Sequence, residues 1–276
     1  MCGAPRLSSV VATMKQRIDL LLVERGLAAS RERAQALILA GRVLVDEQKI
    51  EKPGTRVAGE AAIRLLGDDL KYVSRGGLKL EAALDHWRLD VAGRVCLDVG
   101  ASTGGFTDCL LQRGAARVIA IDTGYGQIAA RLRSDARVHL LEKLNARHLR
   151  AGDLPEAAAS ASFLAMDVSF ISATLVLPAV VAAIREARAA RSPSSAQPAE
   201  RALLDAVVLV KPQFEAGREQ VGRGGIVRDA AVQQSALEKV RAAMQTLGFG
   251  ELDSIESPIL GGEGNREFLL KGAFHF

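Results

Sequence analysis

Short apolar runs alternate with segments of helical spacing from residue 95 onward. Continuous apolar runs that end in Gly, Asp or Asn are typical of strands buried on both faces, as in parallel sheets. The alternation predicts an α/β fold, in which a mostly parallel, Rossmann-like sheet carries helices on both faces. Two later apolar stretches would add two strands, and the last would return antiparallel. The expected strands are residues 95–99, 118–121, 138–141, 163–166, 206–210, 249–259 and 268–272, and a helix is expected over 79–89.

The front of the chain has a different pattern. Apolar residues at helical spacing predict a helix that starts near Ile18, and a second helix that Ser30 caps and Gly41 ends. Short apolar segments at 43–45 and 61–66 follow, with polar turns between them. Two short helices followed by short strands predict a small α+β domain ahead of the larger one.

Changes in composition mark the boundaries between these parts. Residues 1–13 have no apolar periodicity and no signal-peptide pattern, and whether they belong to the native protein stays open. The apolar stretch 175–184 contains Pro178 and is too short to span a bilayer. We expect a disordered extension at 1–13, a small domain at 14–66, a linker at 67–77, and an α/β domain at 78–276 with a flexible loop at 188–203.

The excess of positive charge lies in the front third of the chain. Residues 1–80 hold 14 basic and 9 acidic side chains, whereas the remainder holds 22 and 23. Such a segment is suited to contact with phosphates, although an ordinary solvated helix face would have the same composition. The spacing of Cys2, Cys96 and Cys109 fits neither a disulfide framework nor a metal site, which favours a reducing, cytoplasmic setting. The four histidines form no cluster, so no metal is expected.

A strand, a glycine-rich loop and a helix follow one another between Val95 and Cys109, which is where nucleoside cofactors bind in α/β folds. The glycine spacing is not G-x-G-x-x-G, and an acid stands just before the first glycine. S-adenosylmethionine, which carries no phosphate, therefore fits better than a dinucleotide. Asp122 ends the next strand, where it can accept hydrogen bonds from ribose hydroxyls. The alternatives are helix-capping acids with an ordinary turn, or a nicotinamide site. The predicted cofactor residues are Asp98, Gly100, Ser102, Thr103, Gly104, Gly105, Phe106, Asp122, Asn145 and Asp167.

Four charged residues are expected at the same edge of the sheet. Asp167 and Lys211 each follow a predicted strand, and the carboxyl ends of parallel strands meet at one edge. Lys79 lies on the helix before the first strand, and Glu267 stands at the start of the returning strand. Taken singly, each is more typical of a surface cap or salt bridge. The glycine-rich segment 222–225 is either a mobile substrate loop or a plain hinge.

The order Lys79, Asp167, Lys211, Glu267 resembles the Lys-Asp-Lys-Glu tetrad of FtsJ-like ribose 2′-O-methyltransferases. Longer strings resemble the TlyA (haemolysin A) family, in which an S4 RNA-binding domain precedes a methyltransferase domain. The resemblance runs from Met14 to the end of the chain and departs from the family near 188–203. The strings are Ser74-Arg-Gly-Gly-Leu-Lys-Leu80, Leu97-Asp-Val-Gly-Ala-Ser-Thr-Gly-Gly-Phe106, Asp122-Thr-Gly-Tyr-Gly-Gln127, Asp167-Val-Ser-Phe-Ile-Ser172 and Val210-Lys-Pro-Gln-Phe-Glu215.

The resemblance implies methyl transfer from S-adenosylmethionine to a ribose 2′-hydroxyl of ribosomal RNA, with Lys211 as the general base. Lys79 would favour the neutral amine of Lys211, whereas Asp167 and Glu267 would oppose it, and the balance depends on distances. Two other interpretations are a membrane-acting cytolysin and an RNA-binding protein without catalysis. The modified nucleotide, the ribosomal subunit and the oligomeric state stay open. The predicted RNA contacts are Arg17, Arg31, Arg33, Arg42 and Arg75.

Overall fold

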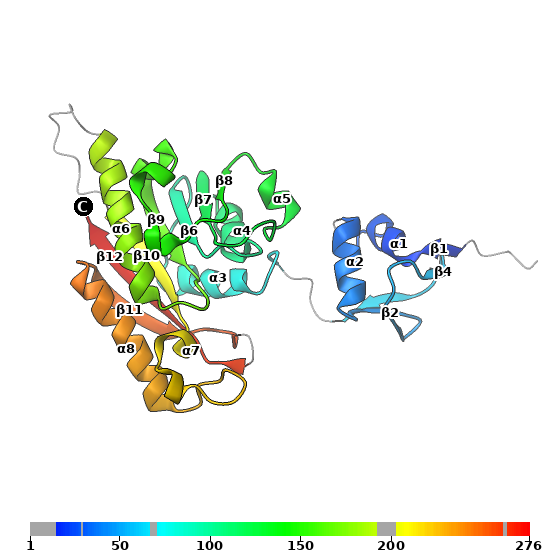
Figure 1. Ribbon diagram of the computed structural model, residues 1–276. Coiled ribbons are helices and arrows are strands. Elements are labelled where there is room, and N and C mark those ends of the chain that lie inside the picture. Colours follow the sequence, from blue (N-terminus) through cyan, green and yellow to red (C-terminus); the bar gives the residue numbers. More distant parts are fainter. Residues whose placement is uncertain (1–14, 29, 67–70, 192–202, 262–263) are drawn as a thin grey trace, which may run out of the picture. The chain divides into compact units, whose positions relative to one another are not determined.

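The computed structural model describes residues 15–28, 30–66, 71–191, 203–261 and 264–276 (Figure 1). Contacts within the chain divide it into two units, 1–69 and 70–276. The extension predicted at 1–13, most of the loop predicted at 188–203 and part of the linker predicted at 67–77 lie outside the described residues.

The first unit has two helices and five short strands around a small apolar core. Ser30 Oγ accepts a hydrogen bond from the backbone N–H of Arg33 at 3.2 Å, so the predicted cap is present. Asp46 and Glu47 both have positive φ, as a two-residue hairpin turn between β2 and β3 requires. The elements are β1 Lys15–Arg17, α1 Ile18–Glu24, α2 Arg31–Leu39, β2 Val43–Val45, β3 Gln48–Ile50, β4 Arg56–Ala58 and β5 Ile63–Leu65.

The second unit is built on a seven-stranded sheet of order β11-β12-β10-β9-β6-β7-β8. The five strands from β10 to β8 are parallel, and β12 is antiparallel to both β10 and β11. The prediction of a parallel sheet with an antiparallel last strand is confirmed. The strands are β6 Val95–Val99, β7 Arg117–Ile121, β8 Val138–Leu141, β9 Ala161–Met166, β10 Leu203–Val210, β11 Gly250–Glu256 and β12 Phe268–His275. The α-helices are α3 Gly76–His86, α4 Gly105–Gln112, α5 Ala130–Arg133, α6 Ala173–Arg191, α7 Pro212–Glu215 and α8 Ala230–Thr246. The 3-10 helices are η1 Ala146–His148, η2 Ala151–Asp153, η3 Glu156–Ser160 and η4 Arg218–Gln220.

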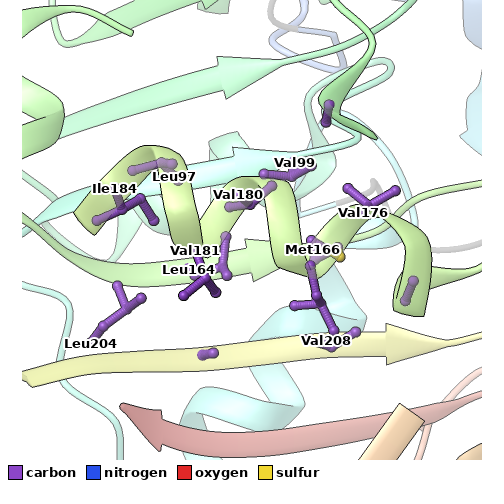
Figure 2. Close-up of a cluster of buried hydrophobic side chains, with 14 of the residues drawn as sticks. Leu97, Val99, Leu164, Met166, Val176, Val180, Val181, Ile184, Leu204 and Val208 are labelled. Carbon is purple, nitrogen blue, oxygen red and sulfur yellow. The ribbon is translucent and has the colours of Figure 1, made fainter. Parts of the chain in front are cut away.

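Apolar side chains cover both faces of this sheet. On one face, alternate residues of the central strands, such as Leu97 and Val99 of β6, pack against Val180 and Ile184 of α6 (Figure 2). On the other face, Cys96 and Phe163 pack with residues of α3 and α4. Burial on both faces explains why these strands are continuous apolar runs in the sequence.

Two expectations need adjustment. The helix expected over 79–89 begins at Gly76, and Tyr72 is fully buried in the second unit, so part of the predicted linker belongs to the folded domain.

Among the helices of the described residues, none has the length and apolar character that crossing a membrane requires.

Candidate active site

The loop between β6 and α4 passes very close to the end of β9. Gly100 has φ of +92°, and a Cβ atom there would lie 2.3 Å from the carbonyl oxygen of Asp167. Gly104, at φ +96°, occupies the N-cap of α4, and a Cβ atom there would lie 2.3 Å from Leu132. Both positions therefore need glycine for the backbone to take this path. Gly104 lines none of the cavities described below, and its contact with a cofactor stays a prediction.

Asp98 is the penultimate residue of β6, before the loop. Its side chain is fully buried on the α4 face of the sheet, where Thr107 Oγ1 donates a hydrogen bond to Oδ2 at 2.6 Å. Burial raises the pKa of the Asp98 carboxyl to about 7, because the charged form loses its hydration. Asp98 is not among the residues that line the three cavities described below, and its contact with a cofactor stays a prediction.

Two cavities lie side by side above the loop and share Gly100, Ser102, Asp167 and Ser169. The first, of about 300 Å³, is also lined by Ser74, Arg75, Gly76, Lys79, Ala101, Thr103, Gly105, Phe106 and Lys211. The second, of about 260 Å³, contains polar and apolar lining residues, among them Asp122, Asn145, Leu144, Ile171 and Val176. An elongated, two-part site of this kind suits a nucleoside with a charged tail.

Asp122 keeps acceptor capacity in the second cavity. Its Oδ2 accepts from the backbone N–H of Ser102 at 2.8 Å, and its Oδ1 accepts from that of Gly124 at 2.6 Å. Each carboxylate oxygen has a further lone pair, so the side chain can still accept from two hydroxyls. Asn145 Oδ1 accepts from the N–H of Arg147 at 3.1 Å, and the residue lines the same cavity.

The four charged residues predicted at the sheet edge lie together as two ion pairs. Lys79 of α3 is paired with Glu267, which directly precedes β12, and both side chains are buried. Lys211, which follows β10, has its Nζ 2.5 Å from Asp167 Oδ1 and donates a hydrogen bond to Ser169 Oγ at 2.8 Å. Each lysine thus has its own carboxylate.

A third cavity, of about 530 Å³, opens on the far side of Lys211. Lys211 and Glu267 line it together with Ser169, Phe170, Gln213, Phe214, Val221, Gly224, Gly225 and Asn265. Phe170 is 91% exposed and has a positive φ of 64°, which is strained for a bulky residue. Lys211 lines both the first and the third cavity.

Sequence reasoning missed Ser74 and Ser169. Ser169 borders all three cavities, and the only signal for it was a polar residue two positions after a strand-end acid. Ser74 lies within the predicted linker, and its Oγ would be 2.3 Å from a Cβ atom at Gly105, so the linker end packs directly on the loop.

Two of the arginines predicted to bind RNA, Arg17 and Arg31, pair with a buried acid in the first unit. Asp19 is fully buried and accepts from Arg17 at 3.0 and 2.9 Å and from Arg31 at 3.0 Å. The hydrogen bonds from Arg17 hold the pKa of Asp19 well below its usual value. Arg42 donates to the backbone oxygen of Leu66 at 2.8 Å. Arg33 is half-buried on α2, and Arg75 is exposed at the rim of the first cavity.

Comparison with known proteins agrees with this geometry. Residues 72–274 match the family of FtsJ-like methyltransferases, and residues 16–63 match the S4 domain. The 16S/23S rRNA (cytidine-2′-O)-methyltransferase TlyA of Mycobacterium tuberculosis is 44% identical over 259 residues, which cover 93% of this chain and 89% of that protein. The chain belongs to the TlyA family of FtsJ-like methyltransferases. The resemblance inferred from the sequence motifs is therefore confirmed.

Other TlyA-family members carry a different name. Hemolysin A of Brachyspira hyodysenteriae is 37% identical, covering 92% of this chain and 98% of that protein. A solved structure from Streptococcus thermophilus, described as a presumed hemolysin, is 41% identical. It covers 95% of this chain and 90% of that chain with a TM-score of 0.67. The matches to both relatives extend over the two units. Proteins with this two-unit architecture are therefore named either as rRNA methyltransferases or as hemolysins.

Proposed function

We propose that this protein transfers a methyl group from S-adenosylmethionine to a ribose 2′-hydroxyl of ribosomal RNA. The observation that carries the proposal is the meeting of Lys79–Glu267 and Lys211–Asp167, from four separate segments, at the wall between two cavities. The TlyA-family relatives named as rRNA 2′-O-methyltransferases support the RNA substrate. Since ribosomal RNA is its substrate, we expect the protein in the cytoplasm.

The first and second cavities fit S-adenosylmethionine. Asp122 would accept from the ribose hydroxyls through its remaining lone pairs, and Asn145 would lie near the nucleoside. Ser102, Thr103 and the backbone at Gly100 and Gly105 would contact the amino-acid end. When bound, this cofactor supplies an electrophilic methyl group on a sulfonium.

Lys211 is the group in position to take the proton of the attacking hydroxyl, because it alone of the two lysines borders both the first and the third cavity. Its Nζ lies 2.5 Å from Asp167 Oδ1, and this contact holds the amine in place. A general base contributes about 10²–10⁴-fold, whereas alignment of two reactants corresponds to effective molarities of about 10⁵–10⁸ M. We therefore assign the larger share of the rate enhancement to alignment.

The first unit would hold folded RNA through phosphates. Asp19 fixes Arg17 and Arg31 side by side while leaving about half of each side chain exposed. Contacts of this kind give affinity and orientation and carry little base specificity. Arg17, Arg31, Arg33 and Arg42 remain our candidates for them, and Arg75 is the candidate in the second unit.

A pair of substitutions at Lys211 separates base catalysis from charge. Lys211→Ala removes the amine, and Lys211→Arg keeps a cation that cannot lose its proton. If Lys211 is the base, both variants lose about 10²–10⁴-fold in kcat. Transfer of tritiated methyl groups to rRNA transcripts gives the rate, and mapping of ribose methylation gives the product. Calorimetric titration with S-adenosylmethionine is the control, because binding should persist in both variants.

Wild-type turnover in Lys211→Arg would refute the base assignment. Lysis of liposomes by the purified wild-type protein, without RNA or cofactor, would favour the cytolysin interpretation over the proposed function.

A further inference from the structure

The segment between α7 and α8 is held firmly beside the active site. Asn265 is buried, and its Oδ1 accepts from the N–H of Val227 at 3.0 Å while its Nδ2 donates to the oxygen of Gly225 at 2.9 Å. Gly222 N–H also donates to the oxygen of Ile226 at 3.0 Å. Asn265 stands two residues before Glu267, so the same short segment fixes both the loop and one member of the ion pairs. These hydrogen bonds tie Gly222, Gly225 and Val227 to defined partners beside the active site.

Three arginines project from this segment. Arg218, Arg223 and Arg228 are exposed, and among the residues that the structure describes none of them forms an ion pair or a side-chain hydrogen bond. Two acids lie close in sequence. Glu219 is exposed, and Asp229 accepts from the N–H of Ala231 at 2.7 Å as the cap of α8. The segment therefore keeps a net positive charge, with its cations unneutralised.

The position of the loop relates these cations to the reaction. Val221, Gly224 and Gly225 line the third cavity, into which Lys211 and Glu267 also open. Gly224 and Gly225 have positive φ and no atom within 4 Å of a Cβ position, so a ligand backbone can approach closely. An anion bound by the arginines would lie at the entrance to this cavity.

We propose that residues 216–228 form an RNA-backbone site, in which Arg218, Arg223 and Arg228 bind the phosphates next to the modified nucleotide. The inference rests on the proposed function and adds a second RNA-binding surface to that of the first unit. Arginine binds phosphate through a planar fork of donors, and such contacts fix position without reading the base. Because a phosphate is joined to the 3′-oxygen of the same ribose, holding it sets the place of the 2′-oxygen relative to Lys211.

The test uses the full-length protein with Arg218, Arg223 and Arg228 all replaced by Ala. Arg117→Ala is the matched control, because Arg117 is exposed without a side-chain partner among the described residues, at the opposite, amino-terminal end of β7. Binding to rRNA transcripts is measured at several salt concentrations, together with kcat and KM for methyl transfer. Loss of three phosphate contacts should reduce the slope of log K against log salt by about 2 for single-stranded RNA. KM for RNA should rise at least about tenfold, while S-adenosylmethionine binding stays unchanged.

A salt slope and KM equal to those of Arg117→Ala would overturn the proposal. So would a triple variant that loses binding to phosphatidylglycerol vesicles but keeps its binding to RNA. The wild type could also show a steeper slope of log K against log salt than the triple variant and yet transfer no methyl group to RNA. In that case the RNA site stands and the proposed function fails.

Discussion

Replacing Asp98 with Asn tests the consequence of a buried carboxyl under the cofactor loop. Asp98 has no exposed surface, and its Oδ1 has no hydrogen-bond donor among the described residues. Its pKa is about 7 in the folded protein, whereas a carboxyl of this type in an unfolded chain has a pKa of about 3.9. Folding therefore favours the protonated acid.

The sign of the pH effect follows from these two values. The stability that Asp98 contributes is fully present below about pH 4 and is lost as the pH rises through 7. Asn cannot ionise and can still accept the hydrogen bond from Thr107. With a shift of about 3 units, the stability of Asp98→Asn relative to the wild type should rise by about 2–3 kcal/mol between pH 5 and pH 8.

Tryptophan fluorescence during denaturant unfolding provides the assay. Trp87, the single tryptophan of the sequence, lies at the end of α3 and donates from its indole N–H to Asp253 at 2.8 Å, so it reports on the second unit. Thr107→Val is the companion variant. It removes the hydrogen bond that favours the carboxylate, so the folded pKa should rise further and the loss of stability should continue to higher pH. A stability difference between Asp98→Asn and the wild type that stays constant from pH 5 to pH 8 would refute the reasoning.

Two further substitutions test single contacts. Gly100→Ala should abolish S-adenosylmethionine binding in calorimetry, because its Cβ would collide with the backbone of Asp167; Gly93→Ala, with positive φ but open space around it, should bind normally. Asp19→Asn should destabilise the first unit by about 1–3 kcal/mol at neutral pH, since Arg17 and Arg31 lose their carboxylate. Because the folded pKa of Asp19 is lowered, this difference in stability should shrink as the pH falls below the usual carboxyl range. Hydrogen exchange of the amides of α1 measures the stability of the first unit. Exchange rates in Asp19→Asn equal to those of the wild type would contradict the prediction.

The strands of the sheet could be predicted because burial on both faces leaves an uninterrupted apolar run. The expected residues 95–99 and 138–141 coincide with β6 and β8. The strands β1, β3 and β4 were not predicted, because polar residues interrupt them; β2, which is equally short, was predicted from its apolar run. Tertiary pairing, such as that of Val43 with both Ile50 and Leu65, decides such strands.

The meeting of Lys79, Asp167, Lys211 and Glu267 could also be anticipated, since parallel strands end at one edge. The pairing of each lysine with one carboxylate could not, because it depends on where α3 crosses the sheet. The face of the sheet to which the Asp98 side chain points could not be predicted either. It depends on the pleat of β6 and on which face α4 covers. The hydrogen bonds of Asn265 join segments about forty residues apart, and no local pattern encodes them.

The place of β12 within the sheet means that the active site can be completed only late in the synthesis of the chain. Glu267 reaches Lys79 only when β12 inserts beside β10, and the two residues are 188 positions apart in the chain. At about 5–20 residues per second, a ribosome needs roughly 10–40 s to make that stretch. Until then β10 presents an open edge, and the ion pair that completes the site is missing. A protein that modifies ribosomal RNA would thus gain its activity only after the segment that carries Glu267 has been made and β12 has joined the sheet.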